Sequence, residues 1–95
     1  MEPSFESDPA KHTENQLKHG VRFGEAQLAF LDAHRVIARD PKHSRTEERF
    51  YCFGRVELGV PTVRFTYRGS KIRIIGAGYW TGRNKVYEAH RKIHK

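Results

Sequence analysis

Apolar residues recur at a helical spacing in the first third of the chain. A helix is predicted over residues 8–20, because Asp8 can accept hydrogen bonds from the free amides of a first turn and a proline follows it at the first helical position. A second, shorter helix is predicted over residues 23–31, where apolar side chains stand three and four residues apart. The N-terminal third of the chain is therefore predicted to be helical.

From residue 35 onward, apolar and polar residues alternate, which is the spacing of a β-strand. Proline and glycine residues divide this alternation into four predicted strands, at residues 35–39, 49–53, 62–67 and 72–77. A last helix is predicted to open at Thr81. The predicted fold class is therefore α+β in the order ααββββα, an antiparallel four-stranded meander sheet with the helices on one face.

The length of 95 residues, 37% of them hydrophobic, allows one small core. Residues 1–95 are therefore expected to form a single domain, in which residues 1–7 could be a loose N-terminus. No stretch approaches the roughly 18 apolar residues of a membrane span, and the N-terminus has no signal-peptide pattern. Because Cys52 is the only cysteine, it cannot form an internal disulfide, which favours a reducing, cytoplasmic location.

Positive charge is concentrated in the second half of the chain, although the whole chain carries only +7. Residues 1–48 hold seven Lys and Arg against nine Asp and Glu, a net charge of −2, whereas residues 49–95 hold eleven against two, a net charge of +9. Such a field attracts polyanions and is typical of nucleic-acid-binding proteins. An anionic membrane surface, an acidic protein partner or a merely solvated surface would fit the same charge.

A two-residue turn at Gly69-Ser70 sets the register of the hairpin formed by the last two predicted strands. The predicted partners are Arg68–Lys71, Tyr67–Ile72, Thr66–Arg73, Phe65–Ile74 and Arg64–Ile75. Because side chains alternate between the two faces of a strand, this register separates apolar from basic residues. The face predicted to pack on the helices holds Val63, Phe65, Tyr67, Ile72 and Ile74, with Phe50 and Cys52 from the neighbouring strand.

The opposite face of this sheet is predicted to be basic. It holds Arg64, Thr66, Arg68, Lys71 and Arg73, with Arg49 and Tyr51 from the neighbouring strand. Only Glu48 and Glu57 stand nearby to neutralise it. Since like charges on adjacent strands cost free energy, this face is expected to bind an anion. The alternative is a solvated polar face, which is common in antiparallel sheets.

Cleavage of RNA through its own 2′-hydroxyl is a reaction that such a face could support. The reaction needs a proton acceptor, cations that stabilise the charge on the pentacoordinate phosphorus, and an acid for the leaving 5′-oxygen. Glu48 or His19 could serve as base or acid, unless Glu48 only forms an ion pair and His19 only caps the first helix. The candidate charge stabilisers are Lys18, Arg49, Arg64 and Arg73. No metal or cofactor is predicted, because only His90 and His94 have the i, i+4 spacing of ligands on a helix and no HExxH motif accompanies them. No phosphate-binding loop is present either.

A specific string of residues covers the end of the first helix and the turn after it: Asn15, Lys18-His19-Gly20-Val21, Phe23 and Glu25-Ala26. Two weaker motifs follow in order, Glu48-Arg49 and Ile72-Arg73-Ile74-Ile75. In these motifs the chain resembles the BrnT toxins of bacterial type II toxin-antitoxin systems. The resemblance implies a RelE-like fold, an RNA-cleaving toxin that halts translation, and neutralisation by a BrnA-like ribbon-helix-helix antitoxin, which itself binds DNA.

The resemblance also implies which residues act on RNA. Motif positions of the family are occupied by Lys18, His19, Glu48, Arg49 and Arg73, whereas Arg64 joins this catalytic set only through the hairpin register. Apart from the resemblance, the residues expected to bind RNA are Arg68, Lys71 and Tyr51, from the predicted basic face, and Trp80. Trp80 could stack on bases or pack under the last helix instead.

Two positions depart from the family pattern. Ser7 stands where the family has a tryptophan, and Gly78 stands where it has an arginine expected to act in catalysis or phosphate binding. The chain is therefore interpreted as a metal-independent endoribonuclease toxin. The alternative is a catalytically weakened or inactive member that acts as an RNA-binding or antitoxin-binding regulatory module. A third hypothesis is a module whose basic face only binds a protein partner, which salt-dependent RNA binding would exclude.

Overall fold

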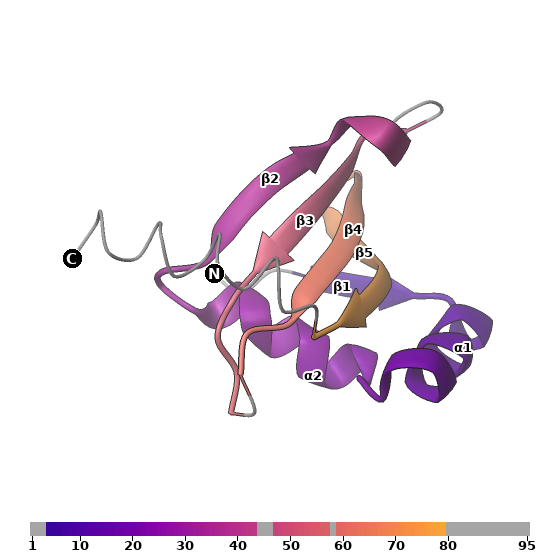
Figure 1. The fold of residues 1–95 in the computed structure, drawn as a ribbon. Coiled ribbons are helices and arrows are strands. Elements are labelled where there is room, and N and C mark those ends of the chain that lie inside the picture. Colours follow the sequence, from indigo (N-terminus) through magenta and orange to yellow (C-terminus); the bar gives the residue numbers. More distant parts are fainter. Residues whose placement is uncertain (1–3, 44–46, 58, 80–95) are drawn as a thin grey trace.

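The computed structural model describes residues 4–43, 47–57 and 59–79. In this part of the chain, five strands form one sheet and two α-helices pack beside it (Figure 1). The helices are α1 (Pro9–His19) and α2 (Phe23–Leu28), and a 3-10 turn, η1 (Ala29–Leu31), continues α2. The strands are β1 (Ser4–Ser7), β2 (Val36–Asp40), β3 (Arg49–Phe53), β4 (Thr62–Arg68) and β5 (Lys71–Gly78), with a second 3-10 turn, η2 (Pro41–His43), after β2.

The two helices predicted in the first third of the chain are present, and local signals explain their limits. The Asp8 carboxylate accepts a hydrogen bond from the Ala10 amide at 2.8 Å, as an N-terminal cap should. Helix α1 ends at Gly20, whose φ of 68° lies in the left-handed region that glycine adopts at little cost. Helix α2 and η1 together cover the predicted range 23–31. No helix in the described part of the chain is long and apolar enough to cross a membrane.

The sheet has the strand order β1-β5-β4-β3-β2, in which β2 to β5 are antiparallel neighbours at nearly the predicted positions. The fifth strand, β1, lies parallel to β5 and was not predicted. The fold is α+β as predicted, but the sheet is mixed and one strand wider than the predicted four-stranded antiparallel meander. Residues 4–7 are held in this sheet, whereas the sequence allowed residues 1–7 to be a loose N-terminus. The helix predicted from Thr81 lies outside the described residues.

The hairpin of β4 and β5 follows the predicted register for four pairs, from Arg68–Lys71 to Phe65–Ile74. Beyond these pairs the register shifts, so that Arg64 lies opposite Gly76 rather than Ile75. The predicted pair Arg64–Ile75 was therefore wrong. Ile75 is the extra residue of a β-bulge, a feature that bends a strand and redirects its side chains.

The main core lies between α2, η1 and one face of the sheet. Phe65 is fully buried at its centre, where it packs against Phe30 with ring centroids 4.9 Å apart. Tyr67 lies on the predicted face but is 50% exposed, because it stands next to the hairpin turn, whose residues are all exposed. The other buried members of this core are Val21, Phe23, Ala26, Ala29, Cys52, Val63, Ile72, Ile74 and Ala77.

A second, smaller apolar cluster occupies part of the opposite face of the sheet. Phe53 and Val60 are buried there, and Val36, Ala38 and Tyr51 pack against them. The predicted basic face is therefore divided. The half formed by β2 and the end of β3 is apolar, and the arginines are confined to the other half.

Candidate functional site

One row of directly opposed residues crosses all five strands on the face away from the main core. In order from β2 to β1, the row is Asp40, Arg49, Thr66, Arg73 and Glu6. A carboxylate stands at each end, with the two arginines between them. The Arg73 guanidinium lies 3.4 Å from the Glu6 carboxylate. The expectation that only two glutamates neutralise this face was therefore wrong, because β1 and β2 each supply a further acid.

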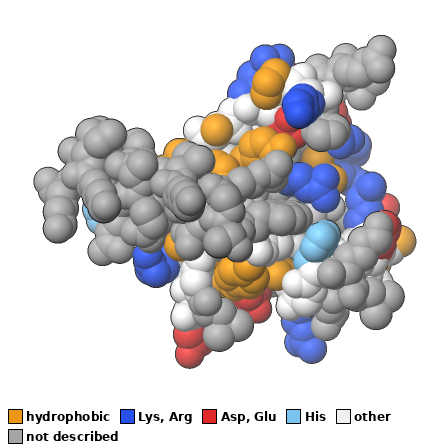
Figure 2. Space-filling view, in the orientation of Figure 1, with side chains coloured by type: hydrophobic (Ala, Val, Ile, Leu, Met, Phe, Trp, Pro, Cys, Tyr) orange, Lys and Arg blue, Asp and Glu red, His pale blue; other side chains and the backbone are white. Residues whose placement is uncertain are grey.

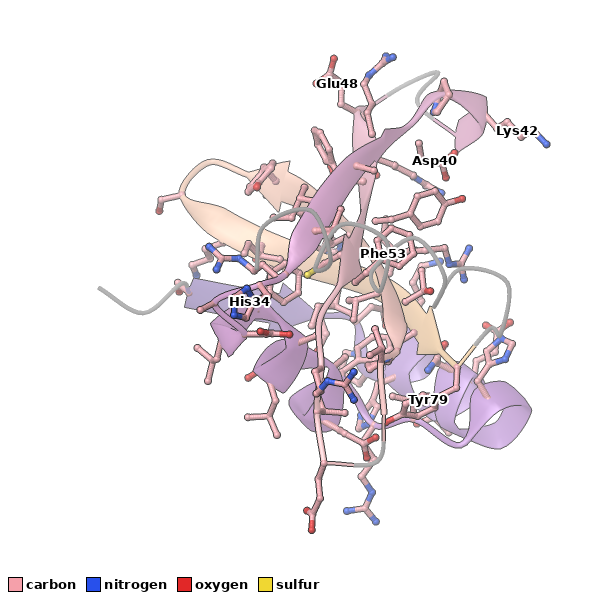
Figure 3. All side chains as sticks on the ribbon, turned by 60° about the vertical axis from the view of Figure 1, so that its left-hand side comes forward. His34, Asp40, Lys42, Glu48, Phe53 and Tyr79 are labelled. Atoms are coloured by element: carbon pink, nitrogen blue, oxygen red, sulfur yellow. The ribbon has the colours of Figure 1, made fainter. Side chains whose placement is uncertain are left out.

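Two more glutamates form ion pairs with arginines near the start of β3. Glu47 lies 3.7 Å from Arg49, and Glu48 lies 3.6 Å from Arg39 on β2. The Glu48 side chain is 66% exposed, and Figure 3 shows it at the opposite end of the sheet from Tyr79. Only the backbone carbonyl of Glu48 reaches inward, where it accepts a hydrogen bond from the buried Thr66 hydroxyl at 2.6 Å. The Glu48 carboxylate is therefore directed toward Arg39 rather than toward the centre of the sheet.

A pocket of about 200 Å³ lies between α1 and the sheet. Strand β1 pairs only with the first half of β5, and the chain then turns at Asp8 so that α1 contacts the second half. The pocket is lined by Lys11, Glu14, Asn15 and His19 from α1, by Arg49 from β3, by Arg64 from β4 and by Ile75 from the bulge of β5. On the face of the molecule seen in Figure 2, Lys and Arg side chains gather beside a histidine side chain.

Asn15 attaches α1 to the sheet. Its side chain is buried, its amide nitrogen donates to the Val21 carbonyl at 3.0 Å, and its amide oxygen accepts from the Ala77 backbone N–H at 2.9 Å. Lys11, Glu14 and His19 stand near Asn15 at the spacing of one helix face. The two hydrogen bonds of Asn15 therefore direct this face toward the arginines of β3 and β4.

Arg64 on β4 lies opposite Gly76 on β5, and its side chain extends over β5 at that position. An added Cβ at Gly76 would stand 2.5 Å from Nη2 of Arg64 and 3.2 Å from Cζ. The Nε atom of Arg64 is buried and has no hydrogen-bond partner among the described residues. The guanidinium therefore lies against the backbone of β5, and its Nε–H has no acceptor in the part of the chain that the structure describes.

The structure brings three of the predicted catalytic residues together, since His19, Arg49 and Arg64 all line the pocket. Arg73 lies on the same face of the sheet but outside the pocket lining, and Glu48 also lies outside it. Lys18 belongs to α1, but its side chain is not among those described.

The predicted RNA-binding residues are spread more widely. Arg68 and Lys71 are exposed beside the hairpin turn. Tyr51 lies directly opposite Arg64, with its ring 6.1 Å from that of Phe53. Trp80 lies outside the described residues. Among the three of these positions that the structure describes, only Tyr51 lies beside a residue of the pocket.

Lys11, Glu14 and Asn15 also line the pocket, although the sequence analysis proposed no role for them. A signal was present, because these residues and His19 recur three and four positions apart on a predicted helix. Helix α1 contains one large apolar residue, Leu17, which is typical of a mostly solvated helix. Its polar face instead borders the pocket, and Glu14 offers a carboxylate there in place of Glu48.

Other reactive groups lie away from the pocket. The Cys52 thiol is buried in the main core, 4.0 Å from the Ala29 carbonyl, and burial raises its pKa to about 12. The Tyr79 hydroxyl donates a 2.7 Å hydrogen bond to Glu25, and burial together with this bond raises the pKa of Tyr79 above its usual range. In the described ranges, no three His, Cys, Asp or Glu side chains are grouped so that they could hold a metal ion.

Comparison with known protein families matches residues 8–84, a segment that contains every residue of the pocket lining. The matching family is described as the ribonuclease toxin BrnT of type II toxin-antitoxin systems. A search of curated proteins found no match. Since the family match covers well over half of the sequence, the chain belongs to the BrnT family of type II ribonuclease toxins.

Proposed function

We propose that this chain is an endoribonuclease toxin whose active site is the pocket between α1 and the sheet. One observation carries the proposal. A carboxylate, an imidazole and two guanidinium groups, from Glu14, His19, Arg49 and Arg64, converge on one small pocket within a ribonuclease toxin fold. These are the groups that cleavage through the 2′-hydroxyl needs.

In the proposed reaction, a base on the enzyme removes the proton of a ribose 2′-hydroxyl, and that oxygen attacks the adjacent phosphorus. The bond from phosphorus to the 5′-oxygen breaks, and an acid on the enzyme protonates the leaving oxygen. The products are a 2′,3′-cyclic phosphate and a free 5′-hydroxyl. Glu14 and His19 share the roles of base and acid, because they are the proton-transfer groups of the pocket lining.

Arg49 and Arg64 stabilise the extra negative charge that develops on the phosphorane. A guanidinium can donate two parallel hydrogen bonds to phosphate oxygens, and it is always charged. Because the pocket already holds two such groups beside Lys11, charge stabilisation in this proposal comes from the protein and needs no divalent cation. Arg73 pairs with Glu6 outside the pocket lining. In this proposal it adds to the positive electrostatic potential around the pocket but does not contact the reacting phosphate.

The family implies an RNA substrate and an antitoxin partner. We propose further that RNA cleavage inhibits translation in the cytoplasm, and that the antitoxin is a BrnA-like ribbon-helix-helix protein whose acidic surface covers the pocket. Contact with DNA would then occur only through the antitoxin. A RelE-like fold is part of the same proposal, supported by the order of helices and antiparallel strands from α1 to β5.

A weakened or inactive toxin is the second candidate function. The observation that favours it is Gly78, which stands on β5 opposite Thr62 at the position where the resemblance to the family implies an arginine. A chain of this kind would bind RNA or the antitoxin through the same arginines without cutting RNA.

The test is cleavage of single-stranded RNA by the purified chain in excess EDTA, with analysis of the product ends. We expect cyclic phosphate and 5′-hydroxyl ends, and we expect Glu14→Gln and His19→Gln each to lower the rate by about 10²-fold or more. Glu48→Gln is the matched control and should leave the rate within a few-fold of wild type. Cleavage that only added metal restores contradicts metal independence, and binding without cleavage supports the second candidate.

A further inference from the structure

Gly76 is the position at which the backbone of β5 leaves room for a side chain from another strand. Arg64 on β4 lies opposite it, and the guanidinium of Arg64 occupies the space where a Cβ at residue 76 would stand. The distances from that Cβ to Nη2, Cζ and Nε would be 2.5, 3.2 and 3.3 Å. Real side chains do not tolerate the shortest of these, so Arg64 and a side chain at residue 76 exclude one another.

The backbone at Gly76 does not itself require glycine. Positive φ angles among the described glycines occur only at residues 20, 59 and 69. Alanine can therefore adopt the conformation of residue 76, and the three atoms nearest to its Cβ would all belong to the Arg64 side chain. The obstacle is the far end of a flexible side chain, so the guanidinium would move and the backbone would stay.

The position that Arg64 now holds suits an anion site. Arg64 lines the pocket together with Arg49, and its buried Nε has no acceptor among the described residues. A buried donor without a partner costs free energy unless a ligand supplies an acceptor. A phosphodiester oxygen bound in the pocket would supply one.

We propose that Gly76 is a positioning residue. Because it has no side chain, the Arg64 guanidinium can stay in the pocket, where it forms part of a binding site for one phosphodiester group. The inference rests on the proposed function for the identity of the anion. Gly76 acts through Arg64 and does not itself touch the substrate.

The first test measures the position of Arg64 without any RNA. In wild type, the buried Nε–H of Arg64 should exchange slowly with water and should show a nuclear Overhauser contact to the Gly76 Hα protons in NMR spectra. In Gly76→Ala, the Nε–H should exchange faster by about tenfold or more and its chemical shift should change, because the displaced guanidinium meets solvent. Gly24→Ala is the matched control, since a Cβ at Gly24 meets nothing within 4 Å.

The second test measures binding of a single-stranded RNA whose 2′-hydroxyls are methylated, so that it cannot be cleaved. We expect Gly76→Ala to weaken binding by about tenfold, as for loss of a hydrogen bond to a charged group. The slope of log affinity against log salt should fall by about 0.7, the value for one phosphate contact on a single strand. Arg64→Ala should cause similar losses, and adding Gly76→Ala to Arg64→Ala should cause no further loss.

The outcomes are distinct. Unchanged exchange and chemical shift of the Arg64 Nε–H in Gly76→Ala overturns the proposal, as does an equal loss of binding caused by Gly76→Ala in the presence and absence of Arg64. Loss of the thermal transition in Gly76→Ala alone would show a packing role and would also overturn it. A wild-type chain that neither binds nor cleaves RNA contradicts the proposed function instead, and the exchange measurement still decides the position of Arg64.

Discussion

Arg73 and Glu6 form an ion pair that joins β5 to β1, with 3.4 Å between Nη1 and Oε1 and with both side chains less than one third exposed. We expect Arg73→Ala to lower the free energy of unfolding by about 0.5–1 kcal/mol, because a partly screened pair contributes about this much. A double-mutant cycle with Glu6→Ala, measured by thermal melts at low and high salt, isolates the pair. Additive effects of the two substitutions would show that the contact contributes nothing.

Substitutions of Arg49 and Arg68, compared with each other, test where RNA is cleaved. Arg49 lines the pocket, whereas Arg68 is exposed beside the hairpin turn. Arg49→Ala should lower the cleavage rate by about 10²–10³-fold, the usual effect of removing one charge donor from a transition state. Arg68→Ala should change it only a few-fold. Equal losses in a cleavage assay would place the reaction nearer the hairpin turn.

Asn15→Ala should destabilise the fold, because it leaves the Val21 carbonyl and the Ala77 N–H without their buried partner. We expect the free energy of unfolding to fall by about 2–3 kcal/mol in urea titrations. Thr13→Ala, which removes an exposed hydroxyl bonded to the Pro9 carbonyl on the same helix, should cost less than about 0.5 kcal/mol. Similar costs for the two variants would mean that Asn15 does not attach α1 to the sheet.

Gly54→Ala should be severely destabilising, although alanine is the smallest possible addition. A Cβ at Gly54 would fall on the backbone carbonyl of Ala29, which cannot move aside as a side chain can. We expect a loss of about 3 kcal/mol or more in the free energy of unfolding. Gly24→Ala, in open space within α2, should be neutral or stabilising by up to about 1 kcal/mol. Chemical denaturation of both variants checks the contrast.

Cys52 predicts a dependence of stability on alkaline pH. Burial raises the pKa of its thiol from 9.0 to about 12, so above pH 9 the unfolded chain loses this proton while the folded chain keeps it. The unfolded state is thereby favoured, and the contribution of Cys52 to the free energy of unfolding should fall by about 1 kcal/mol between pH 9 and 10. The measurement compares wild type with Cys52→Ala at several pH values. If the free energies of unfolding of the two proteins changed in parallel with pH, the thiol of Cys52 would not be buried as described.

Local signals in the sequence were sufficient to predict much of the fold. The Asp8 cap and the left-handed Gly20 set the limits of α1, and the two-residue turn at Gly69 set the hairpin register as far as Phe65–Ile74. Each of these features depends on residues close together in the sequence. The same signals could not show the bulge at Ile75, because it lies where the distant Asn15 bonds to β5.

The candidate site was predicted in part for the same reason. Alternation along the strands indicated that Arg49 and Arg64 share a face, and the structure brings His19 to them. The pairing of Arg73 with Glu6 could not be foreseen, because β1 is only four residues long and too short to show an alternating pattern. Glu14 was overlooked because the polar face of α1 has the composition of a solvated surface, and only its docking against β5 shows otherwise.

The pairing of β1 with the last described strand has a consequence for synthesis of the protein. Asn15 and Ala77, whose hydrogen bond attaches α1 to the sheet, are 62 residues apart, and Glu6 and Arg73 are 67 apart. At about 5–20 residues per second, the ribosome needs roughly 3–13 s to pass from the first residue of each pair to the second. Until β5 has emerged, the nascent chain has no closed pocket. In the proposed function, RNA cleavage would therefore begin only after β5 has left the ribosome, an interval in which an antitoxin made at the same time can reach its target.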